Sequence, residues 1–478
     1  MTVMTQVTKD EWRFWHRTKL AATIIIIGTL LTIVSAVVNT VKMQHATHER
    51  EHLQQTSEAR FLEQPDRHPH RMVHYGHYVF RTPSPLSIIE PGVDAFTGTA
   101  IFLEGHKQNS AMFSDQRQAS GMTRFSSLTP SFLLQVLVPL FIILIGYASV
   151  TREKEAGTLN IMITQGVNLK HLLLGKYFAL VSSGLIMLLP LIIASIWATF
   201  NGESFFVTSG FVAGYILYIL VWSGIVLAVS ALSPKNSVSF AALVSLWIVL
   251  CILLPRIASS SAAAIAPSPG KLEADFAVLE ELRKLGDGHN SADPAFEQLK
   301  KNLFAKYNVD KVEDLPINFR GTVAQFSEKK LTDVLNTFAE KRMQEELDQA
   351  HIARQFGWLT PTTAIRSFSM MISGTSLETH HRFLREAEKL RFDFVQSLNK
   401  VHQDNLNYEA DANRYKNAET AKAARVDAAN WQVLSSFTFE PDTVSTRISH
   451  SFPYVLQLFF WIGAIGFILQ IAIRKINS

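Results

Sequence analysis

The sequence predicts a mainly α-helical membrane protein that carries a large helical domain outside the bilayer. Of its 478 residues, 47% are hydrophobic and 18% are charged, which is too apolar for a disordered or nucleic-acid-binding protein and too polar for a bare bundle of spans. Six uncharged apolar runs approach the length of about 20 residues that crosses a bilayer as a helix. Between the last two runs, residues 259–451 space apolar side chains three and four apart among polar ones, which indicates amphipathic helices.

The six apolar runs are the expected transmembrane helices. They occupy residues 20–41, 132–150, 177–200, 205–232, 237–255 and 452–473. None of these runs contains Asp, Glu, Lys, Arg or His, the residues that a proton relay or ion-coupled carrier needs at membrane depth. Ion-coupled antiport is therefore the weaker interpretation of the spans.

Basic residues predict the orientation. They flank the first and last spans and occupy the second and fourth connections, at Arg13, Arg17, Lys19, Arg152, Lys154, Lys170, Lys176, Lys235, Arg474 and Lys475. Because cytoplasmic loops are enriched in Lys and Arg, we expect both termini and these connections in the cytoplasm of a bacterium, beneath its inner membrane. Residues 42–131 and 259–451 then lie on the far side, and the second of these regions is expected to be a domain in its own right. A single cysteine, Cys251, excludes an intramolecular disulfide.

Residues 1–19 precede the first span and contain an aromatic and basic cluster. Trp12 and Trp15 flank Arg13, which suits a cytoplasmic helix lying in the membrane interface. An ordinary aromatic belt at the membrane boundary explains the same residues, so both interpretations stay open. The first span has no small-residue cleavage site after a short apolar stretch, so it is expected to be a retained anchor.

The connection at residues 151–176 carries the most informative motif. It begins Thr-Arg-Glu-Lys-Glu-Ala-Gly-Thr-Leu, in which Arg152, Glu153, Lys154 and Glu155 precede Gly157. A short charged helix followed by a glycine turn would offer a cytoplasmic partner a rigid lever attached to two spans. Charge alone favours a plain cytoplasmic loop. The ordered combination with the later Gly175-Lys176, however, resembles the cytoplasmic signature of ABC-2 type transporter permeases.

Segments outside the membrane extend this resemblance. His-Tyr-Gly-His-Tyr-Val-Phe-Arg at 74–81, Leu-Glu-Gly-His at 103–106, Asp-Gly-His-Asn-Ser-Ala-Asp-Pro at 287–294 and Leu-Pro-Ile-Asn-Phe-Arg-Gly at 315–321 are similar to ABC-2 permeases with a DUF3526-type domain. The resemblance implies a non-enzymatic permease subunit that pairs with an identical or paralogous permease in the lipid bilayer. It also implies a separate cytoplasmic ABC ATPase dimer that holds ATP and Mg²⁺. The substrate does not follow from the resemblance.

The residues agree with an external energy source. No Gly-x-x-x-x-Gly-Lys-Ser/Thr loop for nucleotide phosphates occurs in the sequence. The mixed charge on the expected helices of the large domain suits a protein partner outside the membrane better than a small-molecule pocket. We therefore expect the complex either to export a substrate or to act mechanically on a periplasmic protein, and no nucleic acid partner is expected.

Histidines suggest an alternative. His45, His48 and His52 share one face of a helix, and His48-Glu49-Arg50-Glu51-His52 matches the zincin pattern of a membrane-anchored zinc hydrolase. The charged residues between these histidines favour a solvated helix that extends the first span. His74 and His77 follow with His68 and His70 in a loop-like stretch, where imidazoles are common metal ligands. Metal binding by these histidines stays open.

Overall fold

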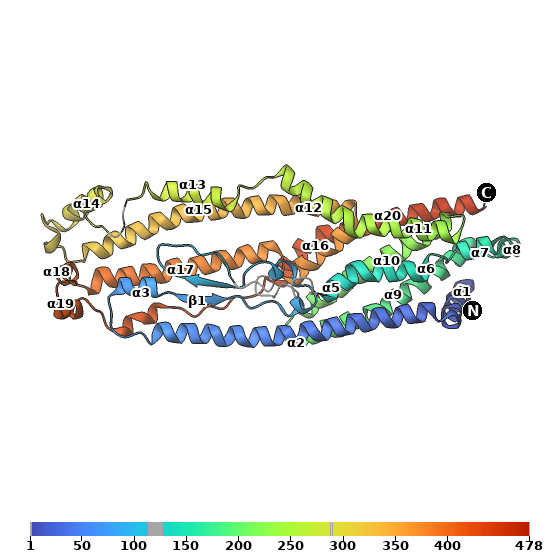
Figure 1. Cartoon of the computed structure of the whole chain (residues 1–478), viewed down its shortest axis with the longest axis horizontal. Coiled ribbons are helices and arrows are strands. Elements are labelled where there is room, and N and C mark those ends of the chain that lie inside the picture. The colour runs from blue at the N-terminus through green and yellow to red at the C-terminus, as the bar shows by residue number, and fades with distance from the viewer. Residues whose placement is uncertain (1, 113–127, 287, 289, 478) are drawn as a thin grey trace.

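The computed structural model describes residues 2–112, 128–286, 288 and 290–477 as an elongated helical molecule (Figure 1). Both termini lie at one end, together with α7 (Thr151–Glu155) and α8 (Thr158–Thr164). The opposite end holds α18 (Tyr408–Ala412) and α19 (Ala418–Ala423). The charged motif of the sequence therefore lies at the end of the molecule that holds both termini.

Six helices in the described part of the chain are long and apolar enough to cross a membrane, as predicted. Four of them are single helices, namely α2 (Leu20–Leu62), α9 (Leu169–Phe200), α10 (Phe205–Leu232) and α20 (Val444–Asn477). The fifth, Pro130–Glu155, combines α5 (Pro130–Phe132), η4 (Leu133–Leu137), α6 (Val138–Gly146) and α7. The sixth, Asn236–Ile265, combines α11 (Asn236–Trp247), η5 (Ile248–Leu253) and α12 (Leu254–Ile265). The bounds of α10 coincide with the predicted run. The other helices extend past their apolar runs because polar and charged residues continue the helix beyond the apolar stretch.

Two of these helices contain π-helical segments, η4 and η5. A wider π turn interrupts the regular ladder of backbone hydrogen bonds, so carbonyl groups nearby can accept bonds from side chains. Gln135 O accepts from the Tyr218 hydroxyl at 2.6 Å, and Val136 O accepts from Trp247 Nε1 at 2.8 Å. These bonds tie the helix that contains η4 to α10 and α11.

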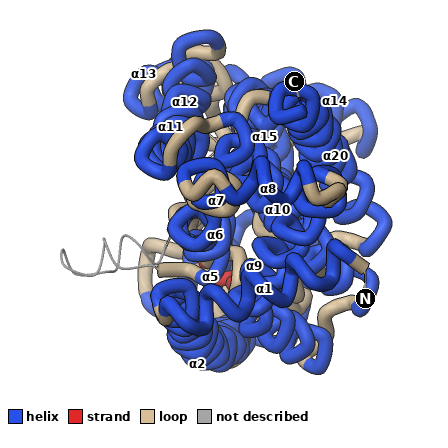
Figure 2. The backbone as a smooth tube through the Cα atoms, turned by 90° about the vertical axis from the view of Figure 1, so that its right-hand side faces the viewer, coloured by secondary structure: helices blue, strands red, loops and turns tan. Residues whose placement is uncertain are grey.

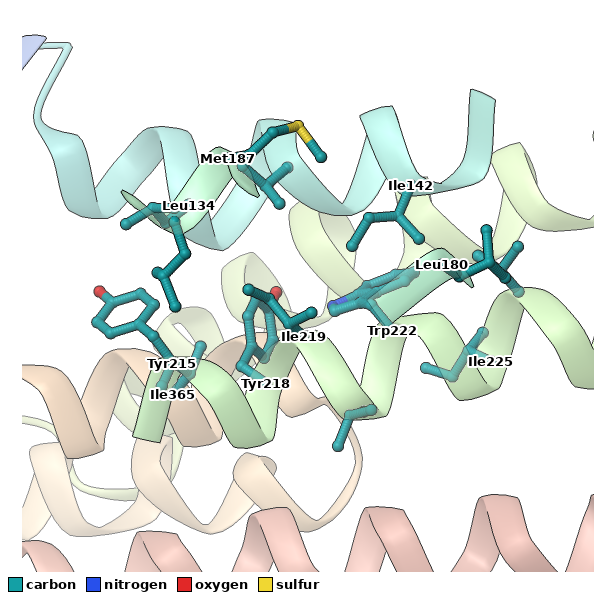
Figure 3. Packing of buried hydrophobic residues seen from close by; sticks show 14 of the residues in the cluster. Leu134, Ile142, Leu180, Met187, Tyr215, Tyr218, Ile219, Trp222, Ile225 and Ile365 are labelled. Atoms are coloured by element: carbon teal, nitrogen blue, oxygen red, sulfur yellow. The ribbon is translucent and has the colours of Figure 1, made fainter. Parts of the chain in front are cut away.

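The core of the helix bundle is centred on α10, which packs against α6, α9 and α20. Figure 3 shows Ile219 and Trp222 of α10 beside Ile142 of α6 and Leu180 of α9, and all four side chains are buried. Small residues allow close approach, since a Cβ on Gly184 of α9 would lie 2.6 Å from Ile219. The central helix is thus covered on several sides by its neighbours.

Helix α16 (Pro361–Ser373) also belongs to this bundle, although the sequence assigned all of 259–451 to the separate domain. It packs against α10 and α20, and Thr362 Oγ1 lies 3.0 Å from the Tyr218 hydroxyl of α10. A Cβ on Gly214 would lie 2.0 Å from the Phe368 ring, so glycine is required there. An amphipathic pattern alone does not reveal which neighbours bury the apolar face of α16.

Three further elements pack with the bundle: α1 (Val3–Thr18), η1 (Pro85–Ile88) and η8 (Phe356–Trp358). The other helices and strands form the part of the molecule away from the termini. They are α3 (Pro69–Tyr75), β1 (His77–Phe80), η2 (Gly92–Ala95), β2 (Ala100–Leu103), α13 (Lys271–Leu282), η6 (Pro294–Phe296), α14 (Glu297–Tyr307), η7 (Val312–Asp314), α15 (Phe319–Gln355), α17 (Leu377–Asn405), α18, α19 and η9 (Ala428–Val433). The strands pair antiparallel with His77 opposite Leu103.

The two predicted extracytoplasmic regions contribute to a common hydrophobic cluster. Phe61, Val73 and Ile101 from the first region pack in the same cluster as Phe394 and Trp431 from the second. The end of α2, α3 and the β1–β2 hairpin therefore complete one of the hydrophobic clusters of the region 259–451. Long-range pairing of this kind leaves no periodic signal in the sequence.

Candidate functional site

The charged motif forms an elbow of two short helices, α7 and α8, joined at Gly157. Gly157 adopts φ +70°, and a Cβ added there would meet no atom within 4 Å. This left-handed conformation favours glycine and lets the chain turn sharply between the helices. The elbow lies at the end of the bundle that also holds both termini (Figures 1 and 2). The predicted charged helix followed by a glycine turn is confirmed.

The first two charged residues of α7 bind the N-terminal helix and α9. Arg152 Nη2 donates to Glu11 Oε1 of α1 (Val3–Thr18) at 3.0 Å, and its guanidinium lies 3.8 Å from the centroid of the Phe14 ring. Glu153 Oε1 accepts from Lys176 Nζ of α9 at 2.6 Å. α7 is therefore ionically bonded to two different helices.

The next two charged residues bind two further helix ends. Lys154 Nζ donates to Ala231 O at 2.5 Å and to Ser233 O at 3.1 Å, at the C-terminus of α10. Glu155 Oε1 accepts from the backbone N–H of Asn236 at 2.9 Å, at the start of α11. A cation at a helix C-terminus and an anion at a helix N-terminus both satisfy the helix dipole and its unpaired backbone groups. Four consecutive charged residues thus contact four different helices.

Lys176 is the centre of this network. Its ammonium group lies 2.5 Å from Glu11 Oε1 and 2.6 Å from Glu153 Oε1. Lys176 is 1% exposed and Glu11 is 4% exposed, so these charges are stabilised by each other and hardly at all by water. The sequence identified Lys176 as a basic residue near a span and as part of the Gly175-Lys176 pair of the motif, and it gave no individual role to Glu11. The burial of Glu11 could have been predicted from helical spacing, which puts Glu11 one turn before Trp15 on the apolar face of α1.

The predicted interfacial segment forms α1, which packs against α9. Trp15 is buried, and Trp12 Nε1 donates to Ser182 Oγ of α9 at 2.9 Å. Arg13 points away, where it pairs with Asp10 at 3.3 Å. A Cβ on Gly175 would lie 2.7 Å from both Met4 O and Val7 Cβ, so the close contact between the helices requires that glycine.

A small pocket lies between the elbow and the ends of α10 and α20. Its lining residues are Lys154, Gly157, Leu159, Asn160, Ala231, Leu232, Lys475 and Ile476. Lys154 and Lys475 make the lining electropositive. The pocket could therefore receive an acidic or carbonyl group from a partner.

The histidines of the zincin pattern lie far along α2, which extends the first span as predicted. His45, His48, Glu49 and His52 are all exposed. In the part of the chain that the structure describes, the groups with metal-ligand spacing contain none of these residues. His48 and His52 are therefore not joined there by a third ligand of the kind a zincin needs.

The predicted loop-like stretch is instead α3 followed by β1. His77 is buried, with its ring 5.6 Å from that of Phe61 and 5.1 Å from that of Phe394. This burial lowers the pKa of His77 to about 4, so the ring is neutral at pH 7. His77 is a core residue, whereas His74 joins His70 and His106 in a group with metal-ligand spacing.

A second group, which is fully buried, joins His68, His402 and Asp411. Asp411 Oδ1 lies 3.0 Å from His68 Nε2, and Asp411 Oδ2 lies 2.8 Å from His402 Nε2. Arg414 also donates to Asp411. Although burial raises the pKa of Asp411, hydrogen bonds from the two histidines lower it well below its usual value. This carboxylate is a buried hub that ties α18 to α17 and to the start of α3.

The fold and these sites define a mainly helical chain with six candidate membrane spans and a large helical part beyond them. Residues 271–440 match the family model described as "Domain of unknown function (DUF3526)". This confirms the DUF3526 part of the sequence resemblance, while the ABC-2 part stays a prediction. Of the segment quoted for it at 287–294, Asp287 and His289 lie outside the described residues. No curated protein matches the chain.

Proposed function

We propose that this chain is the permease subunit of an ABC-2 type transporter, driven by a separate cytoplasmic ATPase. The observation that carries the proposal is the elbow of α7 and α8, whose residues Arg152, Glu153, Lys154 and Glu155 contact four different helices. A push on this elbow would act on α1, α9, α10 and α11 together. The exposed face of α8, with Ile161 at 55% exposure, is left for the ATPase.

The proposed orientation puts the elbow in the cytoplasm. Basic residues gather at the end of the molecule that holds both termini, and cytoplasmic segments of membrane proteins carry this excess. The ATPase would then approach α8 and the electropositive pocket beside Gly157, where Lys154 and Lys475 suit an acidic side chain. The motion must come from the partner, because the sequence has no phosphate-binding loop.

Helix α10 offers a route from the elbow to the part of the molecule away from the termini, which includes α3, the β1–β2 hairpin, α15 and α17 and is called the far domain here. Its C-terminal carbonyls are bonded to Lys154, and near its other end Tyr215 lies 3.0 Å from Ser369 of α16. α16 ends at Ser373, shortly before α17 begins in the far domain. A displacement of α7 would thus reach the far domain through packed helices, as expected for export or for mechanical action on a periplasmic protein. A second permease subunit would complete the path at a dimer interface.

The proposal is tested by purifying the tagged chain from its native membrane in mild detergent. We expect an ATPase with Walker motifs to copurify and its turnover to fall in Glu153→Gln, which weakens the contact between α7 and Lys176. Glu273→Gln is the matched control, because Glu273 is exposed on α13 away from the elbow. A chain that purifies without any ATPase would contradict the proposal, as would equal turnover in both variants.

A further inference from the structure

Three imidazoles converge at the surface of the far domain from two segments of the chain. His70 and His74 lie one turn apart on α3, and His106 lies in the loop after β2. One ring nitrogen from each histidine lies within 4.8 Å of the other two. His70 Nε2 and His74 Nε2 are 3.2 Å apart. Two nitrogens bound tetrahedrally to Zn²⁺ at about 2.0–2.1 Å would be separated by roughly 3.3 Å, so these two rings are already at ligand spacing.

A buried carboxylate orients the third imidazole. His106 Nδ1 lies 2.9 Å from Glu328 Oε2 of α15, and Glu328 is fully buried. The other oxygen, Glu328 Oε1, accepts from Arg391 Nη1 of α17 at 2.6 Å. A carboxylate on one ring nitrogen fixes the tautomer and directs the other nitrogen to a metal, which is the usual outer-sphere arrangement of zinc histidines. His106 is thus held in a ligand orientation by groups in the domain core.

The backbone around His106 is also held in place. His106 adopts φ +64°, a left-handed conformation that is unfavourable for a non-glycine residue. The preceding Gly105 donates its N–H to Val73 O of α3 at 2.9 Å, and Arg391 Nη1 contacts Glu104 O at 3.3 Å. These bonds keep the loop against α3, so a strained backbone presents His106 to the two histidines of that helix.

We propose that His70, His74 and His106 bind a first-row divalent cation such as Zn²⁺. Three neutral imidazoles suit such a cation and leave a fourth position for water or another ligand. His74 is exposed, so the cation has a route to the site from solvent. The cation would replace the contact between the rings of His70 and His74.

The other histidine groups fit a cation less well. The buried group of His68, His402 and Asp411 already contains the guanidinium of Arg414, which repels a metal ion. His48 and His52 offer two exposed imidazoles on α2 and have no third ligand in the described part of the chain. Among the histidine groups in the described part of the chain, the site at His106 is the one that combines three imidazoles with a buried carboxylate behind one of them. It is independent of the proposed transport function, because its test requires neither ATP nor an ATPase.

The test is Zn²⁺ binding to the full chain, purified in detergent with a tag that contains no histidine and stripped of metal. Calorimetry should give one tight site per chain, and His74→Ala should weaken its affinity by about 100-fold or more. Removing an outer-sphere partner costs about 10- to 100-fold, so Glu328→Gln should have a smaller effect. Since His74 is exposed, its metal-free variant should melt at the wild-type temperature, which separates lost binding from lost folding.

His52→Ala is the matched control, since His52 is also exposed and belongs to a pair of histidines one turn apart on a helix. It should retain the wild-type affinity. Co²⁺ loaded into the wild-type chain should give the intense visible absorption of a tetrahedral site, and His74→Ala should abolish it. The proposal is overturned if the wild-type chain binds no Zn²⁺ tightly, if His74→Ala keeps its affinity, or if His52→Ala loses it.

Discussion

Replacing Lys176 by methionine should release α1 from the helix bundle. Lys176 Nζ lies 2.5 Å from Glu11 Oε1 and 2.6 Å from Glu153 Oε1, and the ammonium group is almost fully buried. Its removal leaves two carboxylates close together with only Arg152 to balance them. Breaking a buried ion pair from one side costs about 3–5 kcal/mol. Detachment of α1 relieves that cost by moving Glu11 into water.

Limited trypsin digestion measures this detachment at Arg13 and Arg17 of α1. When opening is fast relative to cleavage, the cleavage rate follows the population of the open form. A shift of about 3 kcal/mol raises that population by roughly 100-fold, and N-terminal cleavage should accelerate accordingly. Lys170→Met is the matched control, because Lys170 is exposed at the start of α9, the helix that also carries Lys176. A surface substitution of this kind changes the free energy of unfolding by no more than about 0.5 kcal/mol.

A second substitution sharpens the test. Combining Lys176→Met with Glu11→Gln should restore part of the protection, because removing both partners of a buried pair is far less damaging than removing one. The ion-pair argument is refuted if Lys176→Met is cleaved as slowly as Lys170→Met. It is also refuted if the effects of Lys176→Met and Glu11→Gln simply add.

Three further predictions follow from single residues. Gly157→Ala should lower ATPase coupling because alanine strains the left-handed turn by about 1 kcal/mol, whereas Gly157→Asn should retain the coupling because asparagine tolerates that conformation. ATPase turnover of the purified complex distinguishes the two variants, and equal turnover would contradict the role of the turn. Asp411→Asn should destabilise the far domain by about 3–5 kcal/mol and lower its melting temperature, while Asp404→Asn at an exposed position should not. Equal melting temperatures of the two variants would contradict the stabilising role of the buried Asp411 carboxylate. His77 has a pKa of about 4 when folded and about 6.5 when unfolded, so the unfolded chain binds the proton more tightly. Stability should therefore be complete above pH 6.5 and fall by about 3 kcal/mol towards pH 4; melting curves of His77→Phe should lack this part of the pH dependence, and identical pH profiles would refute it.

The candidate spans were predictable because their signal is local. An uncharged apolar run of sufficient length has few alternatives to a membrane helix, and the run at 205–232 gave both ends of α10 correctly. The charged elbow was also predictable, since four charged residues followed by Gly157 specify a short helix and a left-handed turn. The sequence of these charged residues could not reveal which helix each of them contacts.

Contacts between residues that are distant in the sequence could not be predicted. The apolar face of α16 is buried by Gly214 and its neighbours on α10, and the core of the far domain joins Phe61 to Trp431. Such pairs leave no periodic pattern. The histidines illustrate the same limit, because spacing drew attention to His48 and His52, whereas the convergent group depends on His106, which lies more than 30 residues beyond its partners.

Site-specific photo-crosslinking tests the central claim most directly. A photoreactive amino acid at Ile161, exposed on α8 of the elbow, is compared with one at Leu272, exposed on α13 away from the elbow. In native membranes, the account predicts that position 161 crosslinks to an ATPase with Walker motifs and that position 272 does not. Crosslinking of such an ATPase from position 272, or from neither position, would contradict the assignment of the elbow as the surface that receives the ATPase.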